Sequence, residues 1–281
     1  RILAYCKQSI FTIIIWFVIL FVIALVVTKL LDWESLISGS GIPQLEGELA
    51  GKIDAKWWRV LIAKFFGGFL ANFSGLALGR EGPSIQLGAM VGKGIGKVLK
   101  RGKTEERYLL TCGASAGLAA AFHAPLAGVM FALEEVHKHF STPLLISVMT
   151  SSIAADYLMS SILGMAPVFS FNIHGTLPTQ YYWMVIILGI ILGLLGAFYN
   201  KALLFVQSLY NHSKHLNNYT KLLIPFILAG ILGFTVPQLL GSGDTLVDLL
   251  IEGKLTMSLI LLLLAGKFLF AITCFGSGAP G

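Results

Sequence analysis

Long apolar segments constrain this chain more than any other feature of its sequence. Residues 9–28 and 181–197 contain no charged side chain, and residues 255–273 contain only Lys267. Each segment is close to the ~20 residues that an α-helix needs to cross a bilayer. Backbone groups in lipid must be hydrogen-bonded within the protein, so such segments fold as helices. We therefore predict an all-α, multi-pass integral membrane protein in contact with the lipid bilayer.

Composition supports the same class of protein. Hydrophobic residues make up 56% of the 281-residue chain and charged residues 12%, whereas soluble domains contain about 25% charged residues. The first apolar segment exceeds the roughly 7–15 residues of a signal-peptide core, and no small-residue cleavage site follows it. We expect this segment to be a permanent helix.

Positive charge is concentrated between two apolar parts of the chain. Six lysines and arginines fall within residues 93–107, with Glu105 and Glu106 among them. Loops rich in Lys and Arg lie on the cytoplasmic side of membranes, so we place residues 97–107 in the cytosol. A nucleic-acid patch is the alternative, but the position between apolar segments favours the loop. We expect no nucleic-acid partner.

Glycine and proline interrupt the middle of the chain. They occur together or close by at residues 39–43, 79–83, 113–117 and 124–125, and divide this region into pieces shorter than a bilayer. Irregular backbone at membrane depth is tolerated only inside protein or along a wet cavity. The interruptions therefore predict broken or re-entrant helices around a transport site.

Two sets of residues recur along the chain with nearly the same spacing. The triplet Gly-Ser-Gly stands at residues 39–41 and again at 241–243, a shift of 202 positions. A Lys-Phe pair at residues 64–65 and a Ser-Gly pair at residues 74–75 both recur 203 positions later. Together these matches favour a duplicated unit of about 200 residues.

The repeat divides the chain into two parts. Transporters are often built from internal repeats, with the transport site at their interface. We assign residues 1–178 to a first repeat that is incomplete at its N-terminus, and residues 179–281 to the start of a second. The second copy would then be truncated, so we expect this chain to be a piece of a longer protein.

Two of the glycine-rich segments resemble anion sites. Residues 39–43 read Gly-Ser-Gly-Ile-Pro and residues 79–83 read Gly-Arg-Glu-Gly-Pro, each with a proline suited to the start of a helix. Helix N-termini carry unpaired N–H groups and about half a positive charge, so they hold anions without a full cation. The Ser40 hydroxyl would add a donor between two glycines that allow close approach. Tight loops without a ligand are the alternative.

Glu81 is the unusual residue of the second segment. An ionised carboxylate at an anion site competes with the anion, whereas a protonated one vacates the site. Glu81 would thus act as a gate. An Arg80–Glu81 pair in a solvated loop explains the same residues, and spacing alone leaves both interpretations open.

Two adjacent carboxylates, Glu134 and Glu135, lie at the end of an apolar stretch. The end of an amphipathic helix reaching water is the simplest explanation of these residues taken alone. A metal site with His137 and His139 is disfavoured because the spacing is loose for zinc ligands. We expect no metal.

Residues 113–117 formally match the G-x-S-x-G pattern of serine hydrolases. That pattern requires a sharp turn from strand to helix. Here it lies in a small-residue apolar helix, where Ser115 and its neighbouring glycines favour close packing. An intramembrane hydrolase remains a remote alternative, and we expect no enzymatic activity.

The chain resembles the CLC family of chloride channels and chloride/proton antiporters, in particular its prokaryotic members. The signature motifs of that family are matched, in order, by residues 39–43, 79–83 and 276–281. Residues 119–128 also resemble this family, so the similarity covers nearly the whole chain. It implies a CLC-like helical bundle with broken and re-entrant helices and an inverted internal repeat. It also implies a homodimer with a pore in each subunit.

The resemblance gives roles to individual residues. Glu81 would be the gating glutamate, and Glu135 would transfer protons on the cytosolic side. Because channel members usually lack that second acid, Glu135 favours an antiporter over the alternative, a passive chloride channel. Ser40 in place of proline favours chloride over nitrate. The chloride-binding residues would be Ser40, Gly41, Ile42 and Gly82.

The chain also departs from the family pattern. The sequence lacks the phenylalanine motif and the later tyrosine that the family has in its second half. It also lacks the family's helix before residue 9. We expect the intact protein to supply them. The transported species would be chloride and protons, without a cofactor, and the short loops suggest a bacterial plasma membrane.

Overall fold

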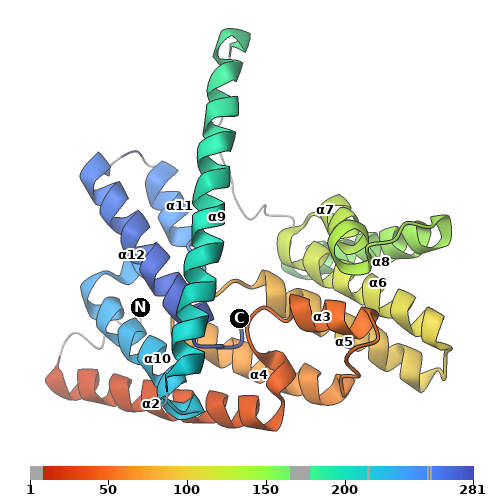
Figure 1. Cartoon of the computed structure of the whole chain (residues 1–281), viewed down its shortest axis with the longest axis horizontal. Helices are drawn as coiled ribbons and strands as arrows, with labels where there is room; N and C mark the ends of the chain where they lie inside the picture. The colour runs from red at the N-terminus through yellow and green to blue at the C-terminus, as the bar shows by residue number, and fades with distance from the viewer. Residues whose placement is uncertain (1–8, 165–177, 214–215, 252, 254) are drawn as a thin grey trace.

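The computed structural model describes residues 9–164, 178–213, 216–251, 253 and 255–281, and every regular element among them is a helix (Figure 1). The prediction of an all-α chain is confirmed. The elements are, in order, α2 (Ile10–Trp33), η1 (Ser35–Ile37), α3 (Ile42–Leu49), α4 (Trp57–Phe73), α5 (Glu81–Val98), α6 (Lys103–Phe122), α7 (Pro125–Phe131), η2 (Ala132–His137), α8 (Thr142–Leu163), η3 (Thr179–Tyr181), α9 (Tyr182–His212), α10 (Asn218–Thr235), η4 (Pro237–Leu239), α11 (Asp244–Ile251) and α12 (Met257–Gly276).

Five stretches of helix in the described part of the chain are long and apolar enough to cross a membrane. They are α2, α8, η3 with α9, α10 and α12. The three predicted apolar segments lie in α2, α9 and α12, and α9 continues well past residue 197 to His212. Helices α8 and α10 were not singled out from the sequence because a few polar residues lower their hydropathy.

Helix α2 shows how these segments meet lipid and protein. Ser9 caps its start by accepting the Phe11 N–H at 3.3 Å. Trp16, Leu20 and Val27 recur at helical spacing and are buried against α10 and α4. The remaining face is apolar but exposed, as expected of a helix that faces lipid.

The α5–α6 pair is the most closely packed part of the bundle. A Cβ added to Gly88 would overlap the Gly113 backbone, and one added to Gly92 would overlap the Leu109 backbone. Gly117 approaches the Ser84 backbone in the same way. The glycine face of α5 is therefore a packing face, as small-residue stripes in membrane helices are.

The predicted interruption at residues 113–117 is wrong. Helix α6 runs without a break through this segment. Because Gly113 and Gly117 are one turn apart, they lie on one helix face, which contacts α5. This contact stabilises the helix and offsets the low helix propensity of glycine.

The other interruptions are confirmed. Gly39 and Gly41 have φ of 62° and 86°, and α3 begins at Ile42. Helix α5 begins at Glu81, two residues before Pro83. His123, at φ 52°, ends α6, and α7 follows immediately.

The two proposed repeats contain matching elements. The order α2, η1, α3, α4 recurs as α10, η4, α11, α12, and both α3 and α11 have eight residues. The glycines that follow η4 also have positive φ, 69° at Gly241 and 112° at Gly243. This correspondence supports the predicted duplication, whose boundaries stay a prediction.

Each glycine loop is bonded to the other half of the chain. Ser38 donates its hydroxyl to the Gly278 carbonyl at 3.1 Å, and the Gly241 N–H donates to the Gly75 carbonyl at 3.0 Å. The Gly281 N–H reaches the Gly39 carbonyl at 3.1 Å, which places the last residues beside the start of α3, in the middle of Figure 1. The halves thus interlock at the predicted transport region.

Candidate anion site

The N-termini of α3 and α5 meet at Ser40 and Gly82. A Cβ on Gly82 would lie 2.5 Å from the Ser40 carbonyl oxygen and 2.7 Å from its Cα, so only glycine permits the approach. Gly41, at the start of α3, contacts the Gln86 side chain one turn further along α5. Two helix N-termini with positive partial charges therefore point to one place, and an anion there would offset their repulsion.

Ser40 is oriented as a donor. Its Oγ accepts the Ile42 N–H at 3.3 Å, which leaves the hydroxyl proton available for another acceptor. Ser40 also lines a cavity of about 900 Å³ between the start of α3, helix α9 and the end of α12. Ser40 therefore borders open space on this chain.

The structure brings together the four predicted chloride-binding residues, Ser40, Gly41, Ile42 and Gly82, with Glu81 beside them. Glu81 is the first residue of α5, and its Oε2 lies over the preceding Gly79, so its carboxylate turns back along the helix start. This is the end of the helix at which a negative charge is favourable.

Arg80 does not form the pair with Glu81 that the alternative interpretation required. Its guanidinium lies 3.8 Å from the Asp244 carboxylate, at the start of α11, and 5.9 Å from the centre of the Phe122 ring. The described contacts of Arg80 therefore give that alternative no support, and the Glu81 carboxylate lies at the start of α5.

Lys64 is a residue that the sequence analysis missed as part of the site. Its Nζ donates to the Ile37 carbonyl at 3.0 Å and to the Gly39 carbonyl at 2.5 Å, and its side chain is fully buried. The amino group of Lys64 thus lies directly behind Ser40. The signal in the sequence is a lysine in an otherwise apolar helix.

Lys267 makes the same contacts in the second half. Its Nζ donates to the Leu239 carbonyl at 3.0 Å and to the Gly241 carbonyl at 2.5 Å. These acceptors lie 202 positions after those of Lys64. The lysine therefore fixes the carbonyls of the glycine loop in both halves.

Glu135 lies apart from these residues, on η2, which packs against α3, α6 and α7. Glu134 and Glu135 are both exposed on this chain. Lys138, just after η2, forms an ion pair with Glu46 of α3 at 3.2 Å. Helix α3 therefore connects the Ser40 end of the site with the element that carries Glu135.

The metal and hydrolase alternatives gain no support from the described residues. His137 Nδ1 lies 2.9 Å from the Thr111 hydroxyl, and the part of the chain that the structure describes has no group of three or more His, Cys, Asp or Glu placed to hold a metal. Ser115 is fully buried within the continuous helix α6. It has neither the turn nor the exposure of a nucleophilic serine.

Comparison with known sequences gives a consistent result. The profile of the voltage gated chloride channel family matches residues 17–281. The H(+)/Cl(-) exchange transporter ClcA of Vibrio parahaemolyticus is 38% identical over 251 residues, which are 87% of this chain and 54% of the relative. ClcA of Vibrio cholerae is 36% identical over 250 residues, again 87% of this chain and 53% of the relative. The chain spans about half the length of these curated relatives.

Solved structures agree with this result. The crystal structure of a slow cyanobacterial Cl-/H+ antiporter superposes with a TM-score of 0.92 at 33% identity, over 98% of this chain and 65% of that one. A CLC-type fluoride/proton antiporter has a TM-score of 0.78 at 21% identity, over 100% of this chain and 71% of that one, and shows the shared fold. With its family profile, its relatives and its fold in agreement, this chain belongs to the voltage gated chloride channel (CLC) family of membrane proteins.

Proposed function

We propose that the protein is a chloride/proton antiporter whose central chloride is held by Ser40, Gly41, Ile42 and Gly82. The observation that carries this proposal is the meeting of two helix N-termini, with Gly82 packed on Ser40. Partial charges and a hydroxyl bind an anion weakly enough for it to leave again, as conduction requires. Relatives named as H(+)/Cl(-) exchange transporters support exchange rather than passive flow.

Glu81 is the gate in this proposal. Ionised, its carboxylate occupies the N-terminus of α5 and competes with chloride for the same N–H groups. Protonated, it has no charge to hold it there, and the anion route opens. One proton therefore moves for each opening, which links proton and chloride movement.

Glu135 delivers the proton from the cytosolic side. Its element contacts α3, the helix that begins at the chloride site, so occupancy of the site and the position of η2 can influence each other. We further propose a homodimer in a bacterial plasma membrane, two inverted repeats with residues 1–178 in the first, and no cofactor and no enzymatic activity.

Uphill proton movement tests this proposal. In vesicles carrying the complete protein, a chloride gradient is expected to drive protons against their own gradient. Glu81→Gln and Glu135→Gln are each expected to reduce proton movement to the level of empty vesicles while chloride flux continues. The readings are vesicle pH and chloride efflux, recorded on the same preparation.

Glu134→Gln is the matched control, because Glu134 is the exposed neighbour of Glu135 on η2. It is expected to keep proton movement within about twofold of the unmodified protein, since a carboxylate without a role in the proton path contributes little. Chloride flux without proton coupling in the unmodified protein would instead favour the passive channel. In that case Glu135 is only a charged residue at a helix end.

A further inference from the structure

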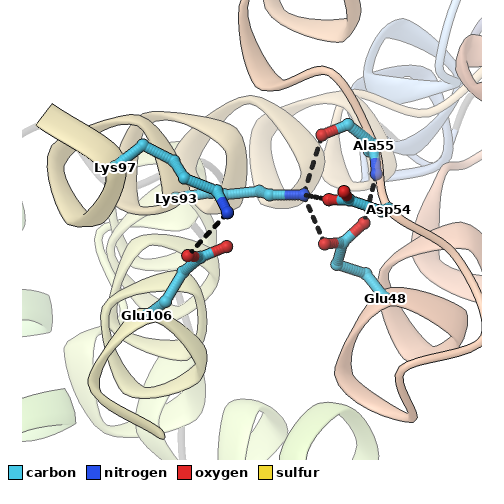
Figure 2. A network of polar contacts seen from close by, with 6 residues as sticks. All are labelled: Glu48, Asp54, Ala55, Lys93, Lys97 and Glu106. Carbon is cyan, nitrogen blue, oxygen red and sulfur yellow. Dashed lines mark hydrogen bonds and ion pairs between the residues drawn. The ribbon is translucent and has the colours of Figure 1, made fainter. Parts of the chain in front are cut away.

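A buried ammonium group joins the far ends of the two helices that form the anion site. Lys93, in the fourth turn of α5, is 1% exposed, and its Nζ donates to Glu48, to Asp54 at 2.8 Å and to the Ala55 carbonyl at 2.7 Å (Figure 2). An ammonium has three N–H donors, so Lys93 is fully satisfied. We name Lys93 with Glu48, Asp54 and Ala55 the Lys93 cluster.

The Lys93 cluster connects α3, the loop after it and α5. Glu48 lies in the last turn of α3, and its second carboxylate oxygen accepts the Ala55 N–H at 2.6 Å. The Glu48 side chain is 9% exposed, whereas that of Asp54 is 87% exposed. Lys93 therefore has one buried and one exposed carboxylate partner, and the buried one fixes α3.

One stripe of α5 contacts both the start and the end of α3. Gly82 meets Ser40, Gln86 meets Gly41, and Lys93 meets Glu48. The stripe shows that the two helices run in the same direction, with both N-termini at the anion site. Parallel helix dipoles side by side repel each other, so this arrangement needs a contact that holds it.

The Gln86 side chain fixes only the site end. It donates to the Leu36 carbonyl at 2.8 Å, just before the glycine loop. Helix α3 has eight residues, which is about 12 Å of helix at 1.5 Å per residue. A helix this short pivots as a unit, so a movement at Glu48 is passed on to Ser40.

We propose that Lys93 is a positioning residue for chloride binding: through Glu48 it holds α3 parallel to α5, and so keeps Ser40 against Gly82. This rests on the proposed function, since it needs chloride to bind at that site. Lys93 itself does not touch the anion. The charge on Asp54 belongs to the cluster as well, because the hydrogen bond and charge of Lys93 lower the pKa of that carboxyl.

Chloride affinity and thermal stability, measured together on the complete protein in detergent, test the proposal. Lys93→Met is expected to weaken chloride binding about tenfold by titration calorimetry and to lower Tm, because Glu48 is left buried without its partner. Combining Lys93→Met with Glu48→Gln removes both buried charges. The double variant is expected to recover much of the Tm, as replacing a whole buried pair often does, while chloride affinity stays reduced.

Two further variants separate the possible outcomes. Asp54→Asn removes the exposed partner of the same ammonium and is expected to change chloride affinity less than about twofold. If the double variant recovers affinity together with Tm, Lys93 only stabilises the fold and the proposal is overturned. If Ser40→Ala leaves chloride binding unchanged in the otherwise unmodified protein, the chloride site itself is wrong, and the positioning role fails with it.

Discussion

Replacing Gly82 by alanine is expected to reduce chloride affinity at least tenfold. The added Cβ would lie 2.5 to 2.8 Å from the carbonyl oxygen, Cα and Cβ of Ser40. Two of these atoms are backbone, so α3 and α5 must separate, and overpacking of this kind costs about 1–3 kcal/mol. The separation moves the Ser40 hydroxyl away from the N–H groups of α5. Titration calorimetry with chloride measures the loss.

Gly193→Ala is the matched control for this substitution. Gly193 lies in the middle of α9, and a Cβ there meets no atom within 4 Å. It is expected to leave chloride affinity unchanged and to stabilise the helix slightly, because alanine favours helix over glycine by up to about 1 kcal/mol. If Gly82→Ala binds chloride as well as Gly193→Ala does, the anion does not lie between α3 and α5.

The sequence predicts the fold class and the parts of the site that depend on local chemistry. Apolar length predicts α2, α9 and α12, because a bilayer leaves the backbone no alternative to helix. The glycine-proline segments predict the starts of α3 and α5, since the left-handed glycines before α3 and the early proline of each helix act within a few residues of themselves. Those two starts contain Gly41, Ile42, Glu81 and Gly82, which the structure places around Ser40. Lys64, the fifth residue beside Ser40, lies outside them.

What the sequence could not predict depends on contacts between distant segments. The same kinds of small residue that form the loop between η1 and α3 at residues 39–41 pack two helices together at residues 113–117, and only the presence of α5 decides between the two outcomes. Lys64 looks like an isolated charge in apolar sequence, and Lys93 looks like the first charge of the basic segment 93–107. Their roles follow from carbonyls and carboxylates on other elements, which no spacing rule connects to them.

Lys64→Met is expected to weaken chloride binding by an order of magnitude while changing thermal stability little. The Lys64 ammonium contacts the Gly39 carbonyl, next to Ser40, with no carboxylate among its described partners. Unit charges several ångströms apart attract by roughly 2 kcal/mol at an effective dielectric constant near 20. Losing the charge therefore acts directly on a bound anion. Stability changes less, because the lost hydrogen bonds are offset by the removal of a buried charge.

Lys267→Met separates the charge of Lys64 from its role in shaping the glycine loop. Lys267 makes the equivalent two contacts to the carbonyls of Leu239 and Gly241, so the loop of the second half loses the same support. If Lys64 acts by its charge, Lys267→Met shifts Tm about as much as Lys64→Met does but leaves chloride affinity intact. Lys64→Arg, which keeps the charge, then retains most of the chloride affinity that Lys64→Met loses. Equal losses of affinity in Lys64→Met and Lys267→Met would mean that the lysines act by holding the interlocked loops, and that the anion is bound by helix termini alone.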